Sequence, residues 1–159
     1  MRIFVVSDTY GDLKKAIELY DRAAANGPVD CIIHCGDFCS DGVRLGQVLG
    51  QVVYAVHGNC DGSWGEEFET VETPAGKILV IHGHNEGVNY SLDGAAALAR
   101  REKCAAVCYG HTHIAEIVEH CGVMILNPGS AVRPLGTEGP SAAVLTADED
   151  GFRASILYL

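Results

Sequence analysis

"RIFVVSDTYGDLKKAIELYDRAAANGPVDCIIHCGD", at residues 2–37, changes its apolar period twice. A run rich in β-branched residues at 2–7 has the pattern of a strand, and apolar positions recur at helical spacing through 12–27. A second apolar run follows at 29–36. Two parallel strands need a long crossover, which is usually a helix, so this order is typical of a βαβ unit. The stretch predicts an α/β fold with a parallel sheet.

The same alternation continues through the first two thirds of the chain. Apolar runs predict strands at 51–58, 77–83 and 105–110, and helical spacing predicts helices at 41–50, opened by Asp41, and 91–103. From residue 114 onward the pattern changes to two hairpins, and we expect this second half to supply an antiparallel sheet. No linker or repeat divides the chain, so we expect one domain over residues 1–159 with a layered α/β sandwich.

Composition excludes several classes of partner. The net charge of −10 and the pI near 5.0 argue against broad binding to nucleic acids or anionic membranes, because both need clustered Lys and Arg. The start of the chain lacks the pattern of a signal peptide and no apolar run is long enough to span a membrane, so we expect a cytoplasmic protein. The seven cysteines include no C-x-x-C pair, and we expect most to be buried thiols.

Polar side chains follow five of the predicted strands at the points where the strands end. They are Asp8, Asp37, Asn59 with Asp61, His82 with His84, and His111 with His113. Any one of them could be an ordinary turn residue or core histidine. Parallel strands present their carboxyl ends at one edge of a sheet, however, so the five groups are expected to converge. Carboxylate and amide oxygens with imidazoles suit Zn²⁺, Mn²⁺ or Fe²⁺, which predicts a divalent metal site.

Five short motifs carry a family resemblance. In order they are "SDTY" (7–10), "CGDF" (35–38), "GNCD" (58–61), "IHGH" (81–84) and "GHTH" (110–113), with "LNPGS" at 126–130. This series resembles the signature of the calcineurin-like metallophosphoesterases, which reads D-x-H, G-D, G-N-x-D, an isolated His and G-H-x-H. The match is nearest to their small bacterial and archaeal phosphodiesterase branch, which also includes the retromer subunit of the same fold.

The resemblance implies a four-layer α/β/β/α sandwich with two divalent metal ions, for which we favour Mn over Zn, Fe or Ni. By the matched motifs, the first metal would be held by Asp8, Asp37 and His113, and the second by Asp37, Asn59, His82 and His111. Asp37 would bridge the two. The nucleophile would be a metal-bound hydroxide rather than a side chain of the protein. The substrates would be small phosphate esters or nucleotides, and an oligomer is compatible with the sequence.

Tyr10 departs from the family pattern, which has a histidine ligand of the first metal at this position. A neutral phenol is a weak ligand, so we predict that the first site is weaker than the second. We expect Tyr10 to lean toward the substrate side, leaving a metal position open to water. His84 and Arg133 are further substrate-side candidates: His84 as a hydrogen-bonding neighbour, Arg133 as a donor to phosphate or a member of a surface ion pair.

Two functional hypotheses remain. The first is a phosphodiesterase with a weakened first metal site. The second is a binding or scaffold protein that keeps the fold and has lost efficient chemistry, and Tyr10 is the feature that motivates it.

Overall fold

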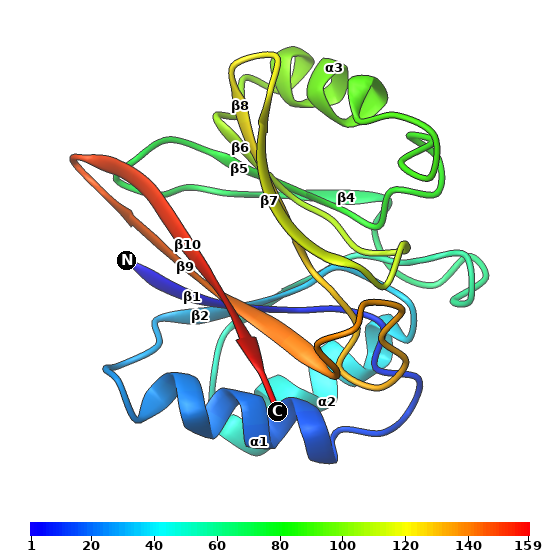
Figure 1. Cartoon of the computed structure of the whole chain (residues 1–159), viewed down its shortest axis with the longest axis vertical. Coiled ribbons are helices and arrows are strands. Elements are labelled where there is room, and N and C mark those ends of the chain that lie inside the picture. The colour runs from blue at the N-terminus through cyan, green and yellow to red at the C-terminus, as the bar shows by residue number, and fades with distance from the viewer.

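The structure, a computed structural model, describes residues 1–159. Two five-stranded sheets pack face to face, with α3 covering the outer face of one and α1 and α2 covering the other (Figure 1). The predicted α/β/β/α sandwich is confirmed. The helices are α1 (Lys14–Ala24), α2 (Cys39–Leu49) and α3 (Asp93–Arg101). None of these three helices is both long enough and apolar enough to cross a membrane.

Each sheet combines parallel strands with one antiparallel hairpin. The first has the order β10-β9-β1-β2-β3 and is built from β1 (Arg2–Val6), β2 (Cys31–His34), β3 (Val53–Ala55), β9 (Ser141–Asp148) and β10 (Gly151–Tyr158). The second has the order β4-β5-β6-β8-β7 and is built from β4 (Phe68–Val71), β5 (Ile78–Ile81), β6 (Ala106–Cys108), β7 (Ala115–His120) and β8 (Val123–Pro128).

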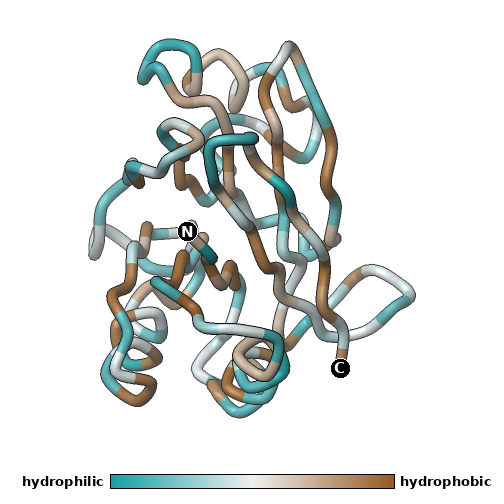
Figure 2. Tube along the Cα trace, turned by 90° about the vertical axis from the view of Figure 1, so that its left-hand side faces the viewer, coloured by the Kyte–Doolittle hydropathy of each residue, from teal (hydrophilic) through white to brown (hydrophobic).

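The core follows the two-residue period of the strands. In β1, Ile3 and Val5 face the second sheet, whereas Phe4 and Val6 face α1 and α2. Successive side chains of a strand point to opposite faces, so a strand covered on both sides must be apolar throughout. Figure 2 shows the hydrophobic residues gathered along the strands. Five of the seven cysteines are buried in these layers and all seven are free thiols, as predicted.

Three details differ from the sequence predictions. The hairpins do not form a sheet of their own, because β9 pairs antiparallel with β1 while β8 pairs parallel with β6. Strand β4 was missed. Asp41 does not open α2, which begins at Cys39, because the Asp41 carboxylate accepts hydrogen bonds from Thr9 and Gly11 instead.

The register places the strand ends of both sheets at one edge. Val6 of β1 pairs with His34 of β2, and the loops that follow remain adjacent, with the Asp8 N–H donating to the Gly36 carbonyl. In the second sheet the Gly110 N–H donates to the His82 carbonyl. The polar residues after β1, β2, β5 and β6 therefore meet where the two sheets come together.

Candidate metal centre

Three side chains form the buried centre of this edge. Asp8, Asp37 and His82 are each at most 2% exposed, and their ligand atoms all lie within 4.8 Å of one another. Buried carboxylates without a cation nearby are costly, so such a group is a strong candidate for divalent metal binding.

His82 is oriented as a metal ligand. Its Nδ1 lies 2.7 Å from the Cys35 carbonyl oxygen, which makes Nδ1 the protonated nitrogen and leaves a lone pair on Nε2. That Nε2 lies 3.1 Å from Asn59 Oδ1 and 3.4 Å from Asp37 Oδ1. Three predicted ligands of the second metal thus point toward one another.

Asp8 and His113 form the corresponding pair on the other side. His113 Nδ1 lies 2.8 Å from the Arg133 carbonyl oxygen, so the proton sits on Nδ1 and Nε2 faces Asp8 Oδ1 at 3.0 Å. Asp8 Oδ1 is buried and has no aligned hydrogen-bond donor, although buried carboxylate oxygens normally have one. An unpaired carboxylate oxygen beside an imidazole lone pair fits a divalent cation, so this donor set fits the metal that the family motifs imply.

His111 is only partly aligned with this group. The backbone N–H of His111 donates to Asp8 Oδ2 at 3.2 Å, and its ring centroid lies 5.0 Å from that of His82. Its Nε2, however, lies 2.8 Å from Asn89 Nδ2, so this nitrogen is turned toward Asn89 rather than toward Asp37. Ligation through Nε2 would require the Asn89 contact to open.

The backbone is strained at the candidate ligands. Left-handed φ values occur at Asp8 (56°), Asp37 (51°), His111 (69°) and His113 (59°). Non-glycine residues rarely adopt this conformation, and such strain concentrates at functional sites. Burial by itself would raise the pKa of Asp37, but His82 and the Cys60 N–H lower it below its usual range. Asp37 is therefore ionised and available to a cation.

Tyr10 lies against the candidate ligands. Its hydroxyl donates to Asp37 Oδ2 at 3.1 Å and lies 2.9 Å from His113 Nε2. Burial and the nearby Asp8 and Asp37 carboxylates raise the pKa of the phenol well above its usual value. The group is therefore a neutral phenol that engages two predicted ligands of the first metal.

The two other substrate-side candidates lie on opposite sides of the group. The exposed Arg133 guanidinium stacks over the Tyr10 ring, 4.3 Å from its centroid. His84 lies beside His82, with ring centroids 5.4 Å apart, and its Nδ1 has no hydrogen-bond partner. Burial and the neighbouring imidazoles of His82 and His111 lower the pKa of His84, which keeps it neutral.

A buried hydrogen-bond chain braces the loop that carries Tyr10. The Gly36 N–H donates to His34 Nδ1 at 3.2 Å, so the proton of His34 sits on Nε2. Nε2 lies 3.0 Å from Thr9 Oγ1, and the Thr9 hydroxyl donates to Asp41 Oδ2 at 2.8 Å. The Gly11 N–H donates to the same oxygen at 2.7 Å. Residues on both sides of Tyr10 are thereby held in place.

This brace predicts a stability loss in acid. Burial lowers the pKa of His34 to about 4, whereas an unfolded histidine titrates near 6.5, so between these values the unfolded chain binds more protons. Lowering the pH through this window should remove up to about 3 kcal/mol from the free energy of unfolding. Urea denaturation of the metal-free protein between pH 7 and pH 4 measures this loss in the free energy of unfolding. His34→Gln should flatten the dependence of the unfolding free energy on pH, and His57→Gln should not. Equal slopes in the wild type and both variants would show that His34 does not cause the loss.

Sequence reasoning assigned no contacts to four residues that shape the site: His34, Asn89, Asn127 and Ser130. Asn89 has no signature near it, and His34 reads only as the end of an apolar strand. In the "NPGS" turn, Ser130 Oγ donates to the Asp8 carbonyl at 2.9 Å and accepts the Arg133 N–H at 2.8 Å. Asn127 Nδ2 donates to the Gly110 carbonyl at 2.9 Å. The turn therefore connects the loops of both sheets, which explains why it accompanies the ligand motifs.

Gly58 permits the close approach of two loops. A Cβ atom at this position would overlap Asp37 Oδ1 and lie 2.5 Å from the Asp37 nitrogen. Gly58→Ala should therefore destabilise the protein by about 2 kcal/mol and weaken metal uptake, because Asp37 must move. Gly136→Ala is the matched control, since its Cβ would meet nothing within 4 Å. Urea denaturation and metal titration of both variants provide the check; equal stability of the two would contradict the overlap.

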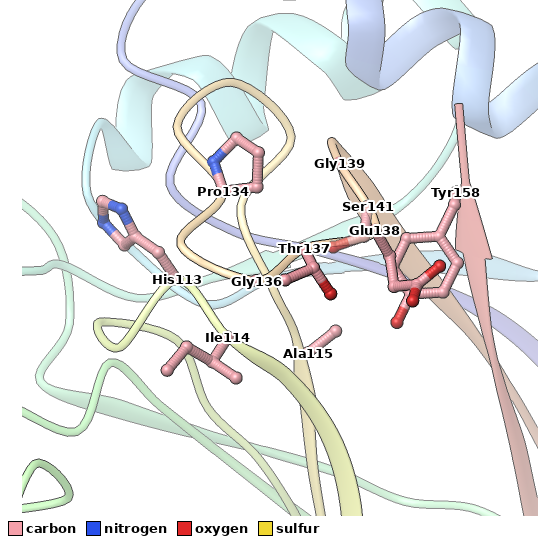
Figure 3. Close-up of a pocket in the computed structure, with 10 residues that line it drawn as sticks. All are labelled: His113, Ile114, Ala115, Pro134, Gly136, Thr137, Glu138, Gly139, Ser141 and Tyr158. Atoms are coloured by element: carbon pink, nitrogen blue, oxygen red, sulfur yellow. The ribbon is translucent and has the colours of Figure 1, made fainter.

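A pocket of about 210 Å³ borders the group through His113. Ile114 and Ala115 line one side, the loop of residues 134–139 lines another, and Tyr158 of β10 lies at the far end (Figure 3). Of the candidate ligands, only His113 reaches it. The pocket offers space for a chemical group next to the centre.

Comparisons with known proteins agree with the geometry. The sequence profile of the calcineurin-like phosphoesterase superfamily domain matches residues 1–150. Phosphodiesterase MJ0936 of Methanocaldococcus jannaschii is 30% identical, with 99% of each chain covered. A conserved protein of Streptococcus pneumoniae, described as a predicted phosphoesterase, superposes with a TM-score of 0.81 at 30% identity over 99% of this chain and 88% of its own.

A fold-level similarity extends further. Vps29 of Entamoeba histolytica, solved in complex with Zn²⁺, superposes with a TM-score of 0.77 at 20% identity, covering 99% of each chain. Identity this low shows the shared fold alone. The profile match and the 30% identical relative over nearly all of both chains carry the assignment, and the predicted resemblance is confirmed. The chain belongs to the calcineurin-like phosphoesterase superfamily.

Proposed function

We propose that the protein is a metal-dependent phosphodiesterase. The observation that carries the proposal is the buried cluster of Asp8, Asp37 and His82, together with the unpaired Asp8 Oδ1 facing His113 Nε2. When bound, two divalent cations, for which we favour Mn²⁺, would supply a nucleophile at neutral pH and neutralise charge on the phosphoryl oxygens. Asp8 and His113 would hold the first with Asp37, and Asn59, His82 and His111 would hold the second with the same Asp37.

Arg133 would bind the substrate phosphate. Its guanidinium is exposed, lies beside the centre, and is held by stacking on Tyr10. Its main chain is anchored by Ser130, so the side chain starts from a fixed point. Guanidinium groups bind phosphate oxygens through paired hydrogen bonds. His84, which is neutral and lies beside His82, is the matching candidate on the opposite side.

The pocket next to His113 supports a diester over a monoester. A diester carries a second organic group on the phosphorus, and this group needs room beside the metal ligands. The 210 Å³ pocket provides such room, and its lining mixes apolar side chains with Thr137, Tyr158 and the carboxylate of Glu138. We therefore place the second ester group of the substrate there.

A chromogenic assay tests the proposal. Chelator-treated protein is supplied with Mn²⁺, Zn²⁺, Fe²⁺ or Ni²⁺ and assayed with bis(p-nitrophenyl) phosphate and p-nitrophenyl phosphate. We expect metal-dependent hydrolysis, fastest with Mn²⁺, and a kcat/KM for the diester about tenfold higher, a difference of about 1.4 kcal/mol. Metal binding without hydrolysis of either ester would overturn it and favour a binding or scaffold protein, the alternative that Tyr10 supports.

A further inference from the structure

A second group of side chains that could bind a metal lies outside the candidate centre. Asp93 is the first residue of α3, His120 is the last residue of β7, and Cys121 begins the turn to β8. Their ligand atoms all lie within 4.8 Å of one another, and His120 Nε2 lies 2.6 Å from Asp93 Oδ1. None of the three belongs to the family motifs.

The three donors differ in chemistry, and together they are the set that zinc prefers. A thiolate, an imidazole and a carboxylate are its usual ligands, with bond lengths of about 2.0–2.3 Å that place neighbouring donors roughly 3–4 Å apart. The Asp93 side chain is 77% exposed, so it can adjust to this spacing beside the partly buried His120. Three protein ligands also leave one position for water.

The backbone holds the thiol beside the imidazole. His120 pairs with Val123, so Cys121 and Gly122 alone form the hairpin turn, with φ values of 52° and 77°. A two-residue turn with both φ values positive is rigid and fixes the positions of its side chains. Cys121 is exposed and unpaired, whereas five of the other six cysteines are buried.

We propose that Asp93, His120 and Cys121 form a surface site for a thiophilic divalent cation, of which Zn²⁺ is the favoured one. The site joins the start of α3 to the tip of the β7–β8 hairpin, which reaches α3 at the top of Figure 1 and already packs on it through Val123 and the alanines of α3. Bound metal would clip the hairpin to the helix. The site is independent of the proposed phosphodiesterase activity, because it shares no residue with the candidate centre.

Cobalt is the probe that separates the two sites. Co²⁺ bound to a thiolate shows a near-ultraviolet charge-transfer band, and none of the proposed ligands of the candidate centre is a cysteine. Cys60 is exposed beside Asn59, so Cys60→Ser is the matched control. With the full chain and a non-chelating reductant, the band should appear in the wild type and in Cys60→Ser and be absent in Cys121→Ser. His120→Ala should weaken cobalt binding about tenfold or more.

Thermal unfolding with and without Zn²⁺ gives a second readout that does not depend on activity. Wild type and Cys121→Ser both keep the candidate centre. A difference between the shifts that zinc causes in their unfolding midpoints therefore reports binding at the surface site. We expect the larger shift in the wild type. The proposal is overturned if the cobalt band is absent from the wild type at saturation, survives in Cys121→Ser or disappears in Cys60→Ser, or if zinc shifts both unfolding midpoints equally.

Discussion

Asp37→Asn should abolish metal-dependent hydrolysis, lowering kcat/KM by a factor of about a thousand or more, which corresponds to about 4 kcal/mol of transition-state stabilisation. Asp37 is the carboxylate that touches both halves of the candidate centre. Its Oδ2 accepts the Tyr10 hydroxyl beside His113, and its Oδ1 faces His82 Nε2 at 3.4 Å. Asparagine has nearly the same volume but replaces one ligand oxygen by an amide NH₂, which cannot bind a cation.

The measurement combines metal content with kinetics. We expect Asp37→Asn to lose metal from both proposed sites, because each depends on this carboxylate, whereas loss of any other ligand should affect one site first. The matched control is Asp21→Asn, which removes an exposed carboxylate on α1 and changes the net charge equally. A variant that keeps two bound metals and more than about a tenth of the wild-type kcat/KM would show that Asp37 does not bridge.

The parts of the fold that depend on the local spacing of apolar residues were predictable from the sequence. Apolar runs and helical spacing identified nine of the ten strands and all three helices, because burial on both faces of a parallel strand leaves a continuous apolar stretch. Which sheet each hairpin joins is set by pairing partners more than a hundred residues apart for β9 and β1, and local pattern carries no such information. Strand β4 was missed because its sequence, "FETV", is short and half polar.

In the candidate site, too, the positions of the residues were predictable and the directions of some side chains were not. Asp8, Asp37 and His82 stand next to strand ends, so convergence followed from parallel topology alone. Asp41 resembled a helix cap because an acidic residue near a helix start is a common cap, yet its carboxylate is committed to Thr9 and Gly11 across the fold. Side-chain direction depends on such tertiary contacts, which the local sequence pattern does not contain.

Tyr10→His should tighten the first metal site by about 10- to 100-fold, or about 1.4–2.7 kcal/mol. The phenol holds its proton, because burial and two carboxylates raise its pKa, and it offers only a weak neutral oxygen. It also occupies Asp37 Oδ2 and lies 2.9 Å from His113 Nε2, so metal entry must break or rearrange both contacts. A neutral imidazole supplies a lone pair and removes this competition.

Tyr10→Phe separates the two contributions. It removes the hydroxyl that competes for Asp37 and His113 without adding a ligand, so we expect an affinity gain of only a few fold, on the order of 0.5–1 kcal/mol. Titration calorimetry with Mn²⁺ measures both variants, with two unequal sites expected in the wild type and two similar ones in Tyr10→His. Equal affinity in all three proteins would show that Tyr10 does not weaken the first site.

Kinetics of Tyr10→His then decide between the enzyme and the scaffold. If the native protein is an enzyme, histidine should raise kcat/KM at limiting Mn²⁺ and change it little at saturating Mn²⁺, because metal occupancy alone is restored. A gain of more than about tenfold at saturation would mean that the native centre is impaired even when filled, which favours the scaffold. A loss despite tighter metal binding would instead assign Tyr10 to the substrate, since its ring also holds the Arg133 guanidinium at 4.3 Å.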